Sequence, residues 1–212
     1  ATRHSYAGDF ILGAVYGATS AEEIASLYDG WAVTYDADMV AAGYRHPAVA
    51  SAMFARAVPK GKGPVLDAGA GTGLIGTLLA ILGYPRIEAL DISEGMLAVA
   101  RAKGVYSDFH HLALGGPLPF ADGHFAAVIS TGVFTSGHVG AEGLPELVRI
   151  CRPGGAIVLT VKETVWDAGV GAAIADMVRS GQAFTADETA PYGSMPNETG
   201  TVPARCLALK VA

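Results

Sequence analysis

The sequence predicts an α/β protein built on a doubly wound, mostly parallel seven-stranded sheet, with a helical lobe at its N-terminus. From residue 64 onward, short apolar runs alternate with segments of helical spacing, which is typical of a parallel sheet with right-handed crossovers. Hydrophobic residues make up 51% of the chain and charged residues only 16%, as a sheet covered on both faces requires. A length of 212 residues suits one compact domain with a small additional lobe.

The N-terminal helical cap is predicted to span residues 1–60. Its first 20 residues are expected to be irregular. Ser20 has the character of a helix N-cap, because acidic residues follow it in the first turn, where the helix dipole favours negative charge. A second helix is expected from Pro47 to Val58, since proline is favoured at the first helical position.

The core is predicted to span residues 61–212. Its strands are the apolar runs, and its helices show apolar spacing of three and four residues between a cap and a glycine or proline stop. The predicted strands are residues 64–68, 86–92, 109–114, 125–130, 156–161 and 204–211. The predicted helices are residues 74–82, 94–103, 145–152 and 168–180.

Composition narrows the range of partners. The net charge of −6 and the absence of a Lys/Arg cluster disfavour nucleic acid. No stretch approaches the roughly 20 apolar residues of a membrane span, so no membrane partner is expected. Cys151 and Cys206 are far apart and lack metal-ligand spacing, which predicts reduced core residues, no metal and a cytoplasmic location.

A glycine-rich turn follows the first core strand and is the most informative feature of the chain. Gly69, Gly71 and Gly73 alternate along it, so the backbone can lie flat against a ligand without a Cβ in the way. Asp67 stands just before these glycines. Its carboxylate would repel a pyrophosphate and would suit a ligand with a positive charge. The helix that starts near Gly73 still offers free N–H groups to a carboxylate.

A second acidic residue occupies the corresponding place on the next strand. Asp91 ends that strand, 20 positions after Gly71, where a carboxylate can accept both hydroxyls of a ribose. The two features together predict a nucleoside-containing cofactor. Residues 71–76 also fit the dinucleotide pattern G-x-G-x-x-G, so an NAD(P)-dependent oxidoreductase is the alternative. Asp67 and the short segment after residue 161, too small for a separate substrate domain, argue against it.

These residues resemble motif I of the class I S-adenosylmethionine-dependent methyltransferases, an acidic residue followed by alternating glycines. The resemblance extends over residues 16–165 and is closest to the branch named after the Williams–Beuren syndrome chromosome region, which shares a Tyr-Asp-x-Trp-Ala segment and a Pro-Glu-Leu helix. The other matching stretches are residues 28–32, 35–36, 92–97, 118–130, 145–147 and 152–155.

The resemblance implies a Rossmann-like methyltransferase fold that binds S-adenosyl-L-methionine and releases S-adenosyl-L-homocysteine. It also implies the cofactor-binding residues, carried over position by position. These are Tyr28, Trp31, Tyr35, Asp67, Gly69, Ala70, Gly71, Gly73, Leu74, Asp91, Ile92, Ser93, Met96, Leu112, Ala113, Ser130 and Thr131.

Two departures from the family pattern concern the third and fourth strands. The family often has a carboxylate after strand three for the adenine amino group, but this chain has Leu112-Ala113-Leu114 there, with Asp108 nearby. Ala126 stands where strand four usually carries an aspartate. Some matching positions also have a plain structural interpretation, since Met96 and the aromatic residues of the cap have the spacing of a packed helix face.

The expected reaction is an in-line displacement that moves the methyl group to a small-molecule acceptor. His138, in the loop after the fourth strand, and Glu163, after the fifth, are the candidates for a general base, and neither is assigned as catalytic. Tyr44-Arg45 could reach the acceptor or lie on the surface. A non-catalytic cofactor-binding module of the same fold is a further alternative. The acceptor's identity and the oligomeric state do not follow from the sequence.

Overall fold

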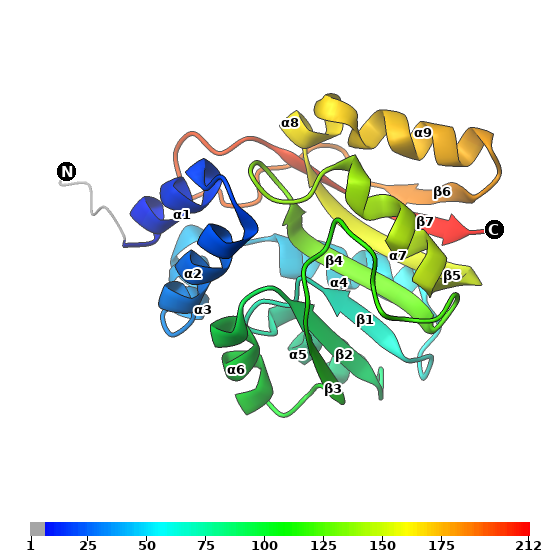
Figure 1. Ribbon diagram of the computed structural model, residues 1–212, viewed down its shortest axis with the longest axis horizontal. Helices are drawn as coiled ribbons and strands as arrows, with labels where there is room; N and C mark the ends of the chain where they lie inside the picture. The colour runs from blue at the N-terminus through cyan, green and yellow to red at the C-terminus, as the bar shows by residue number, and fades with distance from the viewer. Residues whose placement is uncertain (1–6) are drawn as a thin grey trace.

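The computed structural model describes residues 7–212 as a seven-stranded sheet of order β3-β2-β1-β4-β5-β7-β6 (Figure 1). Strands β1 to β5 run parallel to one another, and β7 runs antiparallel to both β5 and β6. The predicted fold class is therefore confirmed. The strands are β1 (Val65–Ala68), β2 (Ile87–Asp91), β3 (Asp108–His111), β4 (Phe125–Phe134), β5 (Cys151–Lys162), β6 (Ala183–Glu188) and β7 (Ala204–Val211).

Helices cover both faces of the sheet, and the first three helices of the chain stand beyond the carboxyl ends of its strands (Figure 1). The α-helices are α1 (Ala7–Gly17), α2 (Ala21–Trp31), α3 (Tyr35–Ala42), α4 (His46–Ala57), α5 (Leu74–Ile81), α6 (Glu94–Ala102), α7 (Leu144–Ile150), α8 (Glu163–Val165) and α9 (Gly171–Arg179). A 3₁₀ turn, η1 (Ala141–Gly143), precedes α7, and a π-helical turn, η2 (Trp166–Val170), joins α8 to α9.

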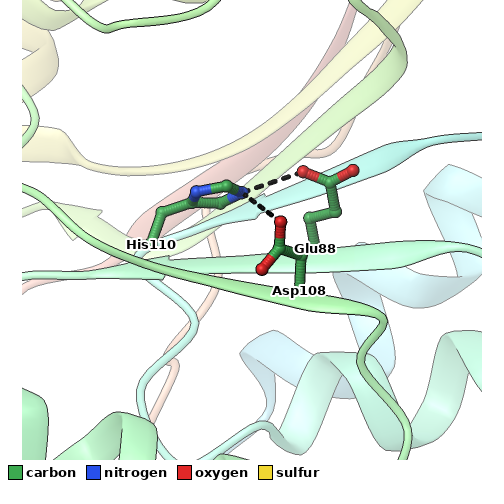
Figure 2. A group of neighbouring side chains, drawn as sticks. All are labelled: Glu88, Asp108 and His110. Carbon is green, nitrogen blue, oxygen red and sulfur yellow. Dashed lines mark hydrogen bonds and ion pairs between the residues drawn. The ribbon is translucent and has the colours of Figure 1, made fainter.

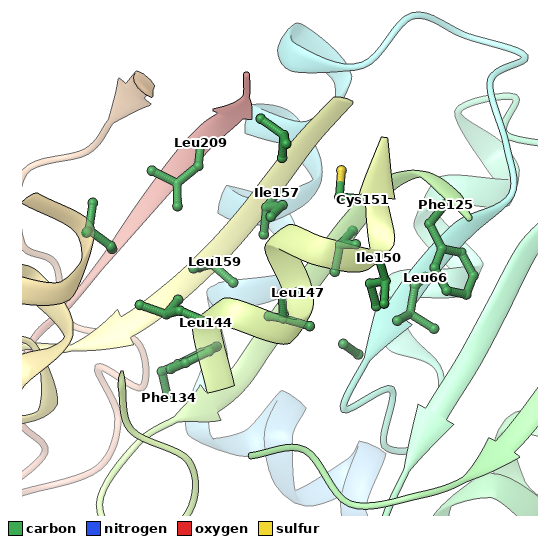
Figure 3. Packing of buried hydrophobic residues seen from close by; sticks show 14 of the residues in the cluster. Leu66, Phe125, Phe134, Leu144, Leu147, Ile150, Cys151, Ile157, Leu159 and Leu209 are labelled. Carbon is green, nitrogen blue, oxygen red and sulfur yellow. The ribbon is translucent and has the colours of Figure 1, made fainter. Parts of the chain in front are cut away.

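The alternation of side chains along each strand divides the core into two layers. On one face, Leu66 of β1 and Val128 of β4 pack with α7 and α9, and Figure 3 shows the α7 leucines over these strands. On the other face, Val65 and Ile129 pack with α4 and α5. All four side chains are fully buried. Burial on both faces explains why these strands read as continuous apolar runs in the sequence.

The N-terminal segment is more ordered than predicted. Residues 7–17 form α1, so the expectation of an irregular stretch is wrong there, and residues 1–6 lie outside the described part. Glycines within α1 hid its helical character, but tertiary packing overrides their low propensity, and Val15 is fully buried. The Ser20 cap is confirmed, since its Oγ accepts a hydrogen bond from the Glu23 N–H at 3.1 Å.

One further element differs from the expectation. The chain breaks after α2 and forms the separate helix α3, which the sequence did not indicate. Helix α4 agrees with the predicted helix and packs on the sheet through Met53 and Phe54, so α1–α3 alone stand apart from it. The boundary near residue 60 stays a prediction.

The far edge of the sheet contains β6, which sequence inspection did not locate. Its residues are mostly exposed, including Phe184, so it lacks the apolar run of a central strand. It forms by pairing antiparallel with β7, a contact between distant segments. Strand β4 also continues to Phe134, beyond the predicted end at residue 130. None of the helices in residues 7–212 combines the length and the apolar character needed to cross a membrane.

Candidate functional site

A cavity of about 340 Å³ lies between helices α1–α3 and the carboxyl ends of β1, β2, β4 and β5. This volume falls within the range of small-molecule sites. The position beyond the carboxyl ends of parallel strands is where open α/β sheets bind ligands. Its walls are mainly apolar and aromatic, with few charged groups.

The glycine turn after β1 forms one wall of the cavity. Gly69, Gly71 and Gly73 all have positive φ, at 81°, 55° and 91°, which side chains other than glycine adopt at a cost. A Cβ built at Gly71 would meet no atom within 4 Å, whereas one at Gly69 would lie 2.1 Å from Val133 Cγ2. At Gly71 the turn therefore presents backbone without a side chain to open space.

Asp67 is fully buried beneath this turn and does not line the cavity. Its Oδ2 accepts a hydrogen bond from the Tyr106 hydroxyl at 2.6 Å, and Tyr106 in turn accepts one from the Gly76 N–H at 3.1 Å. Asp67 Oδ1 has no partner among the described residues. Burial raises the pKa of Asp67 to about 7, and the hydrogen bond from Tyr106 opposes that rise.

This pKa predicts a specific pH dependence of stability. Between pH 3.8 and about 7 the folded state keeps a proton on Asp67 that the unfolded state has released, so the free energy of unfolding falls as pH rises. Asp67→Asn removes the titration. The free energy of unfolding of the variant, minus that of the wild type, should rise by roughly 3–5 kcal/mol across this interval and stay flat above it. Denaturant titrations at several pH values test this, and a difference independent of pH would contradict it.

Asp91 ends β2 and is the sole carboxylate among the residues that line the cavity. Its Oδ2 accepts a hydrogen bond from the Gly71 N–H at 2.8 Å, and its Oδ1 accepts one from the Ser93 N–H at 2.9 Å. Burial raises the pKa of Asp91, and these backbone donors oppose the rise. The carboxylate is thus held in place between the glycine turn and the start of α6.

An aromatic wall from α2 and α3 faces the strand ends. The rings of Tyr28 and Trp31 are stacked, with centroids 6.1 Å apart, and Tyr35 meets Trp31 edge-on at 4.8 Å. The indole N–H of Trp31 donates to Asp38 Oδ2 at 2.6 Å. All three rings line the cavity, so the helix-face spacing of these residues serves both packing and the site.

Two aspartates of the same helices connect the aromatic wall to the glycine turn and to α6. Asp29 Oδ1 accepts hydrogen bonds from Ser93 Oγ at 2.5 Å and from the Gly95 N–H at 2.8 Å. Asp36 accepts hydrogen bonds from Thr72 Oγ1 and from Lys103 Nζ. These contacts hold α2 and α3, which belong to the N-terminal helical cap, against the glycine turn and α6, and so they close the cavity.

Removing one of these contacts should loosen the cap. We expect Asp29→Ala to weaken S-adenosylhomocysteine binding by about three- to tenfold, the range for one or two partly exposed hydrogen bonds. Amide hydrogen exchange in α2 and α3 should become faster while the thermal midpoint hardly changes. Glu22→Ala, on the exposed side of α2, is the matched control. Equal effects of both variants on affinity and exchange would show that the contact does not hold the cap.

The opposite end of the cavity, over β4 and β5, carries two basic groups. His138 Nδ1 lies 3.2 Å from the Ser136 carbonyl oxygen, which can only accept, so we assign the proton to Nδ1. His138 Nε2 then accepts from the Tyr28 hydroxyl at 3.2 Å. Burial lowers the pKa of His138 and favours the neutral ring. The second group is Lys162, the last residue of β5.

The structure brings together 11 of the 17 predicted cofactor residues in the cavity wall. These are Tyr28, Trp31, Tyr35, Gly69, Gly71, Asp91, Ile92, Met96, Leu112, Ala113 and Thr131. The other six lie behind the wall or face away from it. They are Asp67, Ala70, Gly73, Leu74, Ser93 and Ser130.

Several of those six residues stabilise the elements behind the wall instead. Ser93 caps α6 by accepting from the Met96 N–H, and Ser130 Oγ donates to the Ala68 carbonyl. Gly73 packs against Tyr106, which a Cβ would approach to 2.9 Å. Leu74 borders a separate shallow hollow.

Sequence reasoning missed part of the wall that distant segments supply. Tyr16 comes from α1, His46 from α4 and Met195 from the segment before β7, and only tertiary contacts bring them to the cavity. Tyr44, whose position the sequence left open, lines the cavity as well, whereas Arg45 is exposed. Lys162 carried a usable signal in the sequence. It follows the predicted strand 156–161 directly, so it is expected at the carboxyl end of that strand, where Asp91 lies on β2.

Glu163, the other candidate for a general base, lies outside the cavity, and so does a cluster of titratable side chains on β2 and β3. Glu163 accepts two hydrogen bonds from Arg205, at 2.7 and 2.9 Å, and is outside the cavity lining. His110 stands on the edge strand β3 with Nε2 2.9 Å from a Glu88 oxygen and 3.9 Å from an Asp108 oxygen, as Figure 2 shows. This group bridges β2 and β3 through the contact of His110 with Glu88, and we assign it that structural role. Asp108 therefore does not supply the carboxylate that the family often has after strand three.

Comparison with known proteins gives the family context. Residues 66–159 match the family model described as a methyltransferase domain. Methyltransferase-like protein 27 of Homo sapiens is 35% identical over 155 residues, which cover 70% of this chain and 62% of that protein. The chain thus spans less than two thirds of the length of this curated relative.

Solved structures share the fold at low sequence identity. The cyclase SpnF superposes with a TM-score of 0.68 at 16% identity, over 92% of this chain and 97% of that one. A geranyl diphosphate methyltransferase in complex with S-adenosylmethionine gives a TM-score of 0.60 at 15% identity, over 78% and 85% of the two chains. Both likenesses support the Rossmann-like architecture.

Proposed function

We propose that the protein transfers a methyl group from S-adenosylmethionine to a small-molecule acceptor, starting from the match of residues 66–159 to a methyltransferase domain. The observation that carries the proposal is a single cavity with two chemically distinct ends. The end over β1 and β2 holds a bare glycine turn and a fixed carboxylate, while the end over β4 and β5 holds a neutral imidazole and an ammonium group.

The cofactor end has the shape and donor set that the adenosyl group needs. Open space at Gly71 leaves room for a ligand against the backbone. Asp91 would accept the ribose hydroxyls, and backbone groups of Leu112 and Ala113 would take the place of the adenine carboxylate that this chain lacks. In its ionised form, Asp67 would favour the cofactor's positive charge from beneath the turn, at longer range than a direct contact.

S-adenosylmethionine, when bound, supplies an activated methyl group on its sulfonium, so the protein's task is placement and exclusion of water. The aromatic wall and the two aspartates beneath it would close the cavity over the reactants. Holding the acceptor in line with the methyl group contributes several kcal/mol through lost orientational freedom. The His138 Nε2 now accepts from the Tyr28 hydroxyl, and exchanging that partner for the acceptor would let Nε2 take the acceptor's proton.

The acceptor is proposed to be a small molecule because the site is a cavity of small-molecule size and the chain is acidic. We place the chain in the Williams–Beuren-like branch as part of the same proposal. The Tyr28–Ala32 segment supplies the aromatic wall, and its Asp29 fastens the cap to α6. The oxidoreductase alternative is not favoured, since the domain match and the relatives are methyltransferases.

Calorimetry with S-adenosylmethionine, S-adenosylhomocysteine and NAD tests the cofactor. We expect binding of the first two and none of NAD, and selective binding of NAD would overturn the proposal. Transfer itself is tested by incubating the protein and methyl-labelled cofactor with a metabolite extract and following the label into new products. Cofactor binding without transfer to any component would favour the non-catalytic module.

A further inference from the structure

We infer that Lys162 selects an acceptor that carries an anionic oxygen, a carboxylate or an ionised phenol, on an apolar body. The inference rests on the proposed function, because it concerns the part of the same cavity that the cofactor would leave free. It names a specificity-determining residue and the chemical class of the acceptor.

The topology separates Lys162 from the cofactor end. In the sheet order, β5 is two strands away from β1 and three from β2, where the glycine turn and Asp91 lie. Lys162 is the last residue of β5 and lines the cavity together with Thr131 and Gly132 at the neighbouring part of β4. A ligand that spans the ends of β1 and β2 therefore leaves Lys162 to face the acceptor.

Among residues 11–212, whose side chains the structure describes, the Lys162 ammonium has no anionic partner. Its Nζ lies 4.0 Å from the ring centroid of Tyr16, a contact with a π face rather than with a carboxylate. The adjacent Glu163 is engaged by Arg205 and so cannot neutralise it. A cation that is partly removed from water and lacks a counter-ion favours a ligand that brings a negative charge.

The surroundings of Lys162 favour an anion with an apolar body. Lys162 is the sole Lys or Arg in the cavity wall, and the sole acidic wall residue, Asp91, lies at the other end. The ring of Tyr16 lies against Lys162 Nζ, and Leu12, Val133 and Met195 add apolar surface to the same cavity. Burial lowers the pKa of Lys162, and a bound anion would reverse that effect.

The test uses the full chain saturated with S-adenosylhomocysteine and matched pairs of anionic and neutral ligands. The probes are benzoate against benzamide, 2-naphthoate against 2-naphthamide, decanoate against decanamide, and 4-nitrophenolate against nitrobenzene, each titrated by calorimetry. We expect the anion to bind at least about tenfold more tightly in one or more pairs, the range of a charged hydrogen bond. The carboxylate and phenolate pairs distinguish the two sources of the oxyanion.

Three variants assign the preference to Lys162. Lys162→Met should abolish the preference for the anion, and Lys162→Arg should retain it. Lys60→Met, an equal charge change in an exposed loop, should leave it unchanged. Absence of a preference in every pair, or its persistence in Lys162→Met, would overturn the inference.

Two further outcomes separate this inference from the proposed function. If Lys162→Met weakens S-adenosylhomocysteine binding as much as anion binding, the ammonium contacts the cofactor's carboxylate and the inference is wrong. If the wild-type protein does not bind S-adenosylhomocysteine at all, the proposed function fails and the inference fails with it. Normal cofactor binding with no charge preference refutes the inference alone.

Discussion

Gly71→Val should lower the affinity for S-adenosylmethionine by at least about a hundredfold while the protein remains folded. The valine side chain would extend into open space next to the glycine turn, where we propose that the cofactor lies. It would also hold a β-branched residue at a φ of 55°, which costs roughly 1–2 kcal/mol of stability. Calorimetric titration with the cofactor measures the first effect, and denaturant unfolding measures the second.

Gly61→Val is the matched control for this variant. Gly61 has a positive φ of 76° and open space around its Cβ, but it lies in the exposed loop before β1. The two variants should lose similar amounts of stability, and only Gly71→Val should lose cofactor affinity. Full-strength binding by Gly71→Val would place the cofactor away from the glycine turn and would remove the main support for the proposed function.

Asp91→Asn should reduce cofactor affinity by about ten- to a hundredfold. The carboxylate would lose its charge-assisted hydrogen bonds to the ribose hydroxyls, each worth roughly 1.5–3 kcal/mol, and an amide restores only part of that loss. The amide also replaces one acceptor oxygen with an NH₂ donor, so one of the two backbone N–H groups that now hold the side chain, those of Gly71 and Ser93, would lose its acceptor. Binding of S-adenosylhomocysteine and of free adenosine, both measured by calorimetry, should weaken together.

Glu88→Gln provides the control on the same strand. Glu88 pairs with His110 at the edge of the sheet and does not line the cavity. Like Asp91→Asn, Glu88→Gln replaces a carboxylate on β2 with an amide, but it should change cofactor affinity little. Unaltered adenosine binding in Asp91→Asn would show that the ribose is held by other groups.

Local sequence patterns were sufficient to predict the central strands of the sheet and the turn after β1. Central strands such as β1 and β5 are buried on both faces, so their apolar runs stand out. The alternating glycines after β1 mark a turn with positive φ angles, which other residues adopt at a cost. Ser20 signalled the start of α2 by cap chemistry within a few residues. Strand β6 and helices α1 and α3 were not readable, because their formation depends on partners distant in the sequence.

The sequence by itself determined the fold class, the glycine turn, the carboxylate at the end of β2 and the aromatic segment, since each is encoded in a short stretch whose residue types have few other uses. Only the tertiary structure decided which side chains share the cavity. It placed Asp67 beneath the turn with Tyr106, and it brought Tyr16, His138 and Lys162 from three separate segments to one end. The physical reason is that a strand fixes where its end lies, whereas the content of a cavity depends on how distant segments pack around it.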